Sequence, residues 1–211
     1  NTGMFLSGSD VLGFSTAGAE RMRIDSSGNV GISTTPSDWG WYIDKAIQFK
    51  NGSYIAGRTD ATPAINMGVN SYLTATGGNA WIYYGTGTAT RYNQQSGAHN
   101  FYTAISGTIG NTITWQTSMT IDANSNVGIG TTNPAQNFVV ADATNGNGIE
   151  LVPGTSATIQ TYNRGSSSYN NLNIDTQSTR IRSFDYTTIS TGSALTERMR
   201  WLADGQFWIK L

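Results

Sequence analysis

Short runs that alternate apolar and polar residues follow one another along most of this chain. They recur about every 8 to 12 residues, between Gly-Asn, Asn-Gly, Gly-Thr and Ser-Ser segments that are typical of turns. This spacing favours many short strands and predicts an all-β fold. The strands expected between the repeated motifs described next, and leading into them, are Ala46–Phe49, Tyr54–Ala56, Ala64–Val69, Ala80–Tyr84, Asn100–Ala104, Ile113–Ile121, Phe138–Ala141, Gly148–Val152, Ala157–Tyr162, Leu172–Ile174, Arg180–Phe184 and Leu195–Trp201.

One motif occurs three times along the chain. Residues 21–35 read RMRIDSSGNVGISTT, residues 118–132 read SMTIDANSNVGIGTT, and residues 198–209 read the more divergent RMRWLADGQFWI. The copies are too far apart for a solenoid, whose repeats are about 20 to 50 residues long. We therefore interpret them as elements that mark boundaries between larger modules.

Each copy of the motif predicts a strand, a turn and a second strand. In the first copy, alternation places Met22 and Ile24 on one face and Val30 and Ile32 on one face, and Gly28 supplies the positive φ that the turn needs. A hairpin of this size is marginal in water on its own, so it needs partners. The apolar positions and the turn glycine that define the motif are Met22, Ile24, Gly28, Val30, Ile32, Met119, Ile121, Val127, Ile129, Met199, Trp201, Phe207 and Ile209.

Prolines follow the first two copies of the motif. Pro36 and Pro134 cannot donate to a strand ladder, so each is expected to end a strand and to precede a new module. The domain organisation expected from this is a β shaft element at 1–38, a β module at 39–136 that ends in the second copy, and a β module at 137–211 that ends in the third.

The composition supports an all-β protein with a thin core. Charged residues make up 12% of the 211 residues, against about 25% in typical soluble domains. With three Glu and three Lys, the chain has few of the side chains that favour helices. The aromatic content of 11% and the net charge of -1 argue against disorder. The near-neutral charge gives no drive toward nucleic acid, and no apolar run is long enough to span a bilayer.

Three stretches of the chain resemble tail-fibre and related appendage proteins of bacteriophages. They are Glu20–Ile32 with its echo at Asn126–Pro134, and Arg91–Ala104 with the strand that leads into Met119. The resemblance covers most of 20–136 and again 195–209. It implies an elongated homotrimer in which three chains share each β layer, as in an intertwined prism, with small sandwich-like inserts. Such proteins end in a receptor-binding tip or in a self-cleaving intramolecular chaperone.

The resemblance also implies where the protein works and with what. The expected location is the virion tail fibre, outside the cell, and the expected partners are two further copies of the chain, other tail proteins and a host surface glycan. The low charge fits threefold symmetry, because identical charges near a threefold axis repel one another. The start without Met and the end inside the third copy indicate a segment of a longer protein.

Aromatic residues are the main candidates for ligand contact. Trp39, Trp41 and Tyr42 cluster just after Pro36, and their rings could stack on sugar rings of a receptor glycan. The alternative is packing at a module junction. Alternation in the predicted strand around Trp81 and Tyr83 indicates a two-sided core there.

No catalytic, metal or cofactor site is expected. Asp25 and Asp122 occupy the same place in the motif turn, where the side chain caps its own backbone. Glu20 and Glu197 each begin a Glu-Arg-Met-Arg string, which favours an ion pair. His99 is the only histidine, so one chain cannot form a site with several histidine ligands.

These observations lead to one functional hypothesis and two alternatives. The leading hypothesis is a non-enzymatic structural segment of a phage tail fibre that supports host-receptor binding. The alternatives are a carbohydrate-binding adhesin, in which one insert is a lectin-like sandwich, and a capsule depolymerase whose carboxylates come together between subunits.

Overall fold

The computed structural model describes residues 1–40, 43–58, 62–75, 80–142, 147–154 and 157–172, and the backbone of 186–191, 196–202 and 207–209. Its contacts divide the chain into two compact units, Asn1–Asn171 and Leu172–Leu211. Among the described residues the only helical element is the single turn η1 (Lys50–Gly52), and all other elements are strands. The prediction of an all-β fold is therefore confirmed.

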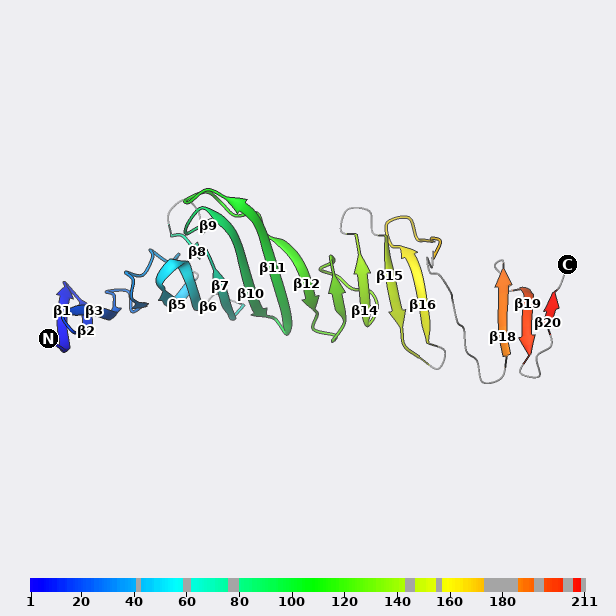
Figure 1. Cartoon of the computed structure of the whole chain (residues 1–211), viewed down its shortest axis with the longest axis horizontal. Coiled ribbons are helices and arrows are strands. Elements are labelled where there is room, and N and C mark those ends of the chain that lie inside the picture. Colours follow the sequence, from blue (N-terminus) through cyan, green and yellow to red (C-terminus); the bar gives the residue numbers. More distant parts are fainter. Residues whose placement is uncertain are drawn as a thin grey trace. The chain divides into compact units, whose positions relative to one another are not determined.

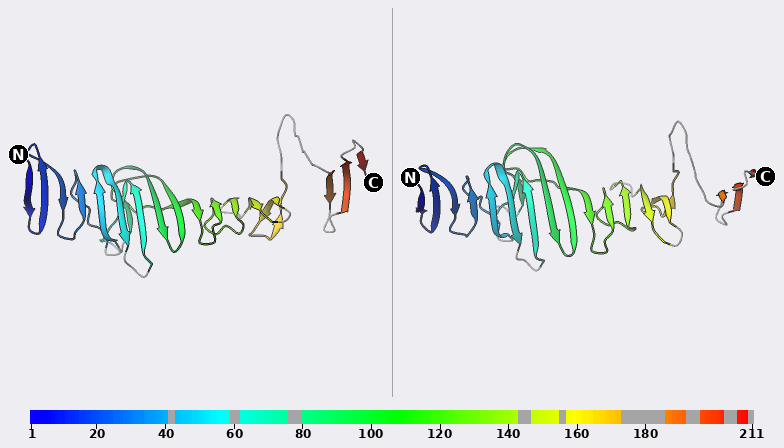
Figure 2. Two further views of the ribbon diagram at one scale, coloured as in Figure 1. Left: turned by 90° about the horizontal axis from the view of Figure 1, so that it is seen from below. Right: turned by 60° about the horizontal axis from the view of Figure 1, so that its bottom comes forward.

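The first unit is built on one open sheet in which the strands follow one another in sequence order, except that β8 and β9 leave the sheet between β7 and β10 (Figure 1). The same succession of strands is visible from two further directions in Figure 2. Described neighbours pair antiparallel except for β4 with β5 and β13 with β14. The strands, in sheet order, are β1 (Gly3–Gly8), β2 (Val11–Thr16), β3 (Ala19–Ile24), β4 (Val30–Ile32), β5 (Ile43–Phe49), β6 (Ser53–Arg58), β7 (Ala64–Val69), β10 (Gly87–Gln95), β11 (Ala98–Gly107), β12 (Gln116–Ile121), β13 (Val127–Ile129), β14 (Phe138–Ala141), β15 (Asn147–Val152), β16 (Thr158–Asn163) and β17 (Ser168–Tyr169).

All three copies of the motif form the same hairpin. In the first copy, Met22 pairs with Ile32 and Ile24 pairs with Val30. The second copy repeats this register with Met119 opposite Ile129 and Ile121 opposite Val127. The third copy lies in the second unit, a three-stranded sheet of β18 (Tyr186–Thr191), β19 (Thr196–Leu202) and β20 (Phe207–Ile209), where Met199 pairs with Ile209 and Trp201 with Phe207. The strand-turn-strand interpretation is confirmed in the first two copies, and in the third copy the pairing of the two strands is confirmed, while the residues between them lie outside the described part.

The turn of the hairpin is also the same in the first two copies. Asp25 Oδ1 accepts hydrogen bonds from the backbone N–H groups of Ser27 (2.9 Å) and Asn29 (2.8 Å). Asp122 Oδ1 does the same for Asn124 (2.9 Å) and Asn126 (2.8 Å). These bonds confirm the turn-capping role expected of the two aspartates.

After each of these two hairpins the next strand pairs in parallel with the last strand of the hairpin, so the loop between them crosses back along the sheet. Gly31 in β4 lies opposite Gln48 in β5, and Gly128 in β13 lies opposite Val139 in β14. The Thr-Thr-Pro segment in between folds back over the glycine, so that a Cβ on Gly31 would stand 2.1 Å from the Thr34 carbonyl oxygen. The sequence did not predict this parallel step.

A second layer covers part of the sheet. β8 (Ser71–Leu73) and β9 (Trp81–Tyr83) form a small antiparallel sheet. One buried cluster joins β8 to β5 and β6, and another joins β9 to β10 and β11. These clusters are Trp39, Ile43, Ala46, Tyr54, Ala56 and Leu73, and Tyr83, Ala89, Ala104 and Ile113. Trp81 packs against both clusters, in agreement with the core predicted around it.

Most of the strands expected between the motifs are present, with shifted ends. Ala64–Val69 and Phe138–Ala141 are confirmed to the residue. The long strand β10 was not predicted, and β12 begins at Gln116 rather than at Ile113. Arg180–Phe184, the end of Leu172–Ile174 and the start of Leu195–Trp201 lie outside the described residues.

The module boundaries expected at 38/39 and 136/137 fall in the loops that join the parallel strands. The main sheet continues across both places through the pairs β4–β5 and β13–β14. The division into three modules stays a prediction.

Candidate functional site: an apolar face of the sheet

Three rows of register partners place apolar side chains on one face of the first unit. The central row runs without a break from β1 to β16. It consists of Leu6, Leu12, Ile24, Val30, Ile47, Ile55, Met67, Tyr92, Phe101, Met119, Ile129, Val140, Ile149 and Thr161. Because side chains two residues apart share a face, the rows beside it lie on the same face. We call this surface the apolar face.

The two flanking rows extend the apolar face on either side. One consists of Gly57, Ile65, Gln94, His99, Ile121, Val127, Phe138, Leu151 and Ile159. The other, at the amino-terminal end, consists of Met4, Phe14, Met22, Ile32, Phe49 and Ser53. The Met, Ile and Val positions of the first two motif copies all belong to these three rows.

The apolar face is open to solvent in the protomer. Its large side chains from β5 to β15 include eight that are between 36% and 45% exposed, namely Ile47, Phe49, Ile55, Met67, Phe101, Phe138, Ile149 and Leu151. The motif residues Met22, Ile24, Val30 and Ile32 are half-buried. Monomeric soluble proteins rarely expose contiguous apolar patches larger than a few hundred Å². An exposed apolar row that crosses so many strands is therefore unusual for a monomer.

The opposite face buries polar side chains as well as the two apolar clusters described above. Asn66 is 0% exposed, Asn93 4% and Thr120 2%, and they are consecutive register partners with Asn100 between the last two. Asn93 Nδ2 donates to Asn66 Oδ1 at 3.1 Å, and Thr120 Oγ1 donates to Asn100 Oδ1 at 2.5 Å. Buried polar groups need such bonds. We call this side the covered face.

The apolar face is hollowed at its centre. A cavity of about 500 Å³ lies between β5, β6, β7, β10 and β11. The side chains of the apolar face that line it are Phe49, Ile55, Met67, Val69, Tyr92 and Phe101. Few polar groups are available there to orient a polar ligand, so the hollow suits apolar side chains better than a sugar.

The three rows contain no Asp, Glu, Lys or Arg. Their titratable side chains are Tyr92 and His99, which are neighbours. The Tyr92 hydroxyl and His99 Nδ1 are 2.5 Å apart, and the two rings are stacked with their centroids at 6.0 Å. His99 is exposed, and its register partners are Gln94 and Ile121. The sequence identified His99 as the only histidine but did not place it on this surface.

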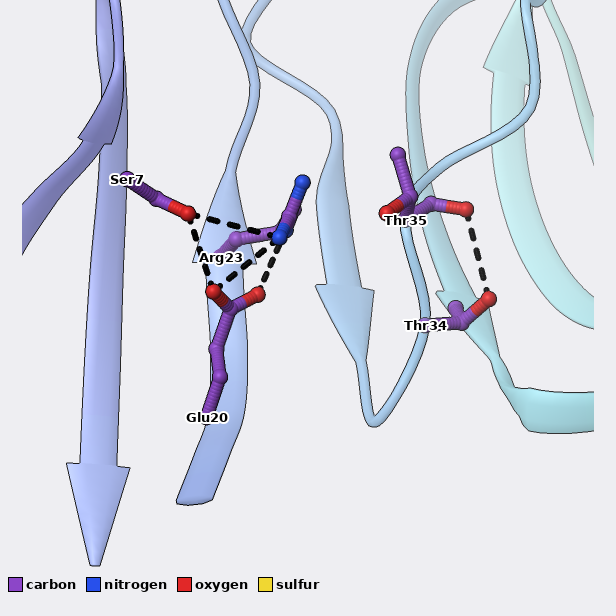
Figure 3. A network of polar contacts seen from close by, with 5 residues as sticks. All are labelled: Ser7, Glu20, Arg23, Thr34 and Thr35. Atoms are coloured by element: carbon purple, nitrogen blue, oxygen red, sulfur yellow. Dashed lines mark hydrogen bonds and ion pairs between the residues drawn. The ribbon is translucent and has the colours of Figure 1, made fainter. Parts of the chain in front are cut away.

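The ion pair expected at the first motif copy is present (Figure 3). Arg23 donates from Nε to Glu20 Oε1 at 2.5 Å and from its second terminal nitrogen to Oε2 at 3.0 Å, and Ser7 Oγ also donates to Oε2. The hydrogen bond from Arg23 lowers the pKa of Glu20, and the bond to Glu20 raises the pKa of Arg23. The side chain of Glu197, in the third copy, lies outside the described residues.

The capping bonds of the second motif turn also have an electrostatic effect. The backbone N–H groups of Asn126 and Asn124 lower the pKa of Asp122, because they stabilise the ionised carboxylate. Asp122 is therefore suited to capping the turn as an anion.

The predicted glycan contacts separate into one buried residue and two residues outside the described part. Trp39 is 8% exposed and packs edge-on against Tyr54, with ring centroids 5.0 Å apart. This burial supports the packing alternative for Trp39. Trp41 and Tyr42 lie outside the described residues, and their contact with a glycan stays a prediction.

Arg91 on the covered face was not identified from the sequence. Its guanidinium carbon lies 4.6 Å from the ring centroid of Trp81, 4.4 Å from that of Tyr102 and 5.1 Å from that of Trp115. Burial lowers the pKa of Arg91. The three rings that surround Arg91 come from separate segments of the chain, so the spacing of residues in the sequence could not reveal the cluster.

Glu150 is a second buried charge that the sequence did not single out. It is 1% exposed, and Arg164 donates to both of its carboxylate oxygens at 2.8 and 2.7 Å. Gln160 Nε2 donates to Oε2 at 2.5 Å. With both oxygens occupied, Glu150 is suited to holding β15 and β16 together rather than to proton transfer.

Among the described residues there is no group of three His, Cys, Asp or Glu that could hold a metal ion. The described residues also contain no helix that is long and apolar enough to cross a membrane. Comparisons with protein-family models, with curated proteins and with solved structures found no match.

Proposed function

We propose that this chain is a non-enzymatic structural segment of a viral tail fibre, that of a phage, in which three copies associate through the apolar face. In the extracellular virion it joins other tail proteins and supports the surfaces that bind a host receptor such as a glycan. The observation that carries the proposal is the central row, which runs from Leu6 in β1 to Ile149 in β15 without a charged side chain and is open to solvent in the protomer.

Association would remove the apolar face from water. Each Å² of apolar surface removed from water contributes about 25 cal/mol, and the rows offer such surface on strand after strand. On the covered face some buried polar side chains are bonded to one another within the protomer, as Asn93 is to Asn66. The apolar face has no partner within the described part of the protomer, so a second and third copy are the natural cover.

The number three comes from the resemblance to tail-fibre proteins, and the apolar face gives the physical reason for association. Uncharged rows suit threefold symmetry, because equivalent charges would face one another around the axis. The same rows contain the Met, Ile and Val positions of the repeated motif. The motif would thus serve two purposes, as a local hairpin and as a strip of the subunit interface.

The test is the native mass of the whole chain at micromolar concentration. We expect a particle of three 22.6 kDa protomers and threefold rods in negative-stain images. Met67→Lys places an ammonium group in the centre of the apolar face, where burial without a partner costs several kcal/mol, about 3 to 5. This variant should be monomeric while its circular dichroism still shows β structure.

Thr114→Lys is the matched control, because Thr114 is exposed and belongs to none of the three rows. It should remain trimeric. A stable, folded, wild-type monomer at micromolar concentration would contradict the proposal, as would a Met67→Lys variant that assembles like the wild type.

A further inference from the structure

We infer that assembly through the apolar face is acid-sensitive and that His99 is the group that senses the pH. This inference rests on the proposed function, because it concerns the surface through which the copies are proposed to associate. His99 is the one residue of the three rows that can gain a full positive charge near neutral pH. Its place among the apolar rows makes that charge costly in the assembly.

The surroundings of His99 offer no anion to compensate such a charge. From β10, Tyr92 and Gln94 face it on the same side of the sheet, and from β12 Ile121 does so. Beyond Gln94 the next register partner in its row is Ile65, and beyond Ile121 it is Val127. None of these side chains carries a negative charge at neutral pH.

The nearest charged groups in the neighbouring strands point elsewhere. Asp122 follows Ile121, but its carboxylate is engaged by backbone N–H groups of its own turn. Arg91 precedes Tyr92 and lies on the covered face against Trp81 and Tyr102. His99 therefore meets hydroxyl, amide and hydrocarbon groups on its own face.

The imidazole is already engaged on one side in the protomer. The Tyr92 hydroxyl takes up its Nδ1, which leaves Nε2 as the nitrogen that faces away from that bond. When neighbouring copies cover the apolar face, water is removed from this nitrogen. A neutral ring tolerates this loss of water much better than an imidazolium does.

The direction of the pH effect follows from this difference. Covering the ring favours its neutral form, so the separated protomers bind more protons than the trimer does in acid. The stabilisation is complete above the ordinary titration range of histidine, near about pH 6.5, and is lost as the pH falls below it. Since a trimer holds three copies of His99, up to three protons are linked to dissociation.

The experiment measures the trimer dissociation constant of the whole chain by sedimentation at several values between about pH 8 and about pH 5. In the steep range the constant should rise by up to about 1000-fold per pH unit, which is the slope for three linked protons. Circular dichroism at each pH separates dissociation from unfolding. His99→Gln cannot gain the charge, and its dissociation constant should change by less than about tenfold over the same range.

Two further variants make the result specific. Tyr92→Phe removes the hydroxyl bonded to Nδ1 but keeps the imidazole, so it should keep the pH dependence. His99→Phe restores an apolar side chain and should stay trimeric at both ends of the range, which covers the case in which His99→Gln fails to assemble.

The outcomes separate this inference from the proposed function. A wild-type protein that is monomeric at neutral pH contradicts the proposed function. A wild-type trimer with a flat pH profile, or a His99→Phe variant that dissociates in acid as the wild type does, overturns the role of His99 and leaves the trimer intact.

Discussion

The glycine of each Val-Gly-Ile string is required by the loop that follows it. A Cβ on Gly31 would stand 2.1 Å from the Thr34 carbonyl oxygen and 2.9 Å from Pro36 Cδ, and a Cβ on Gly128 would stand 2.8 Å from the Thr131 carbonyl oxygen. The backbone must therefore move to accept any side chain at either place. The sequence suggested a flexible turn only at Gly28, whereas Gly31 is needed for close approach rather than for positive φ.

We expect Gly31→Ala to lower the free energy of unfolding by about 1 to 3 kcal/mol and Gly128→Ala to lower it less, because its contact is longer. The measurement is urea unfolding at a fixed protein concentration, since assembly adds to stability. Gly3→Ala is the control, because nothing lies within 4 Å of a Cβ there. Equal effects at Gly31 and Gly3 would contradict this account.

At the scale of elements, the loops that join the first two motif hairpins to their parallel strands are held in place by different contacts. Gln48 is 0% exposed, accepts a hydrogen bond from the Ser37 N–H at 2.7 Å and donates to Ser37 Oγ at 3.0 Å. After the second motif copy the same register position, opposite the motif glycine, holds Val139, and the loop there buries Pro134 instead. The first loop is held by the buried Gln48 side chain, whereas the second has no such side chain and is held by its buried proline and by the bond from Asn126 Nδ2 to the Pro134 carbonyl oxygen at 3.4 Å.

Gln48→Val tests this difference, because it places at position 48 the residue type that Val139 supplies after the second motif copy. The Ser37 N–H would lose its acceptor, and an unpaired buried donor costs about 1 to 3 kcal/mol. We expect a loss of that size in urea unfolding. Gln116→Val is the control at an exposed strand position. No loss at Gln48 would mean that the loop finds another partner.

The elements that the sequence predicted best are those fixed by local chemistry. The motif hairpins follow from alternating apolar residues and from an aspartate that caps the turn. All of these residues lie close together in the sequence. The strand β10 was missed because Arg91 and Asn93 occupy its covered face, so its pattern lacks alternating apolar residues. The parallel step was missed because Pro36 indicated an ending, while the contact that reverses the chain joins Ser37 to the distant Gln48.

At the scale of the whole molecule, the sequence predicted that the chain needs partners but not which surface they would cover. Sparse apolar positions predicted association, and the rows of register partners turn those positions into one surface. Because the register depends on the bulges and on the two parallel steps, the alignment of Met67 with Tyr92 and of Ile129 with Val140 could not be read from spacing. The candidate site is thus a property of the sheet rather than of any motif.

A surface without charges makes a distinct prediction about salt. Between about 0.1 M and about 1 M NaCl the Debye length falls from about 10 Å to about 3 Å, and exposed ion pairs are screened. The apolar rows contain no such pairs, so the trimer dissociation constant at neutral pH should not rise with NaCl. Sulfate is excluded from protein surfaces and strengthens apolar burial, so ammonium sulfate should lower the constant. Dissociation in concentrated NaCl would instead mean that charged groups such as Lys45 and Asp44, in the first half of β5, hold the copies together.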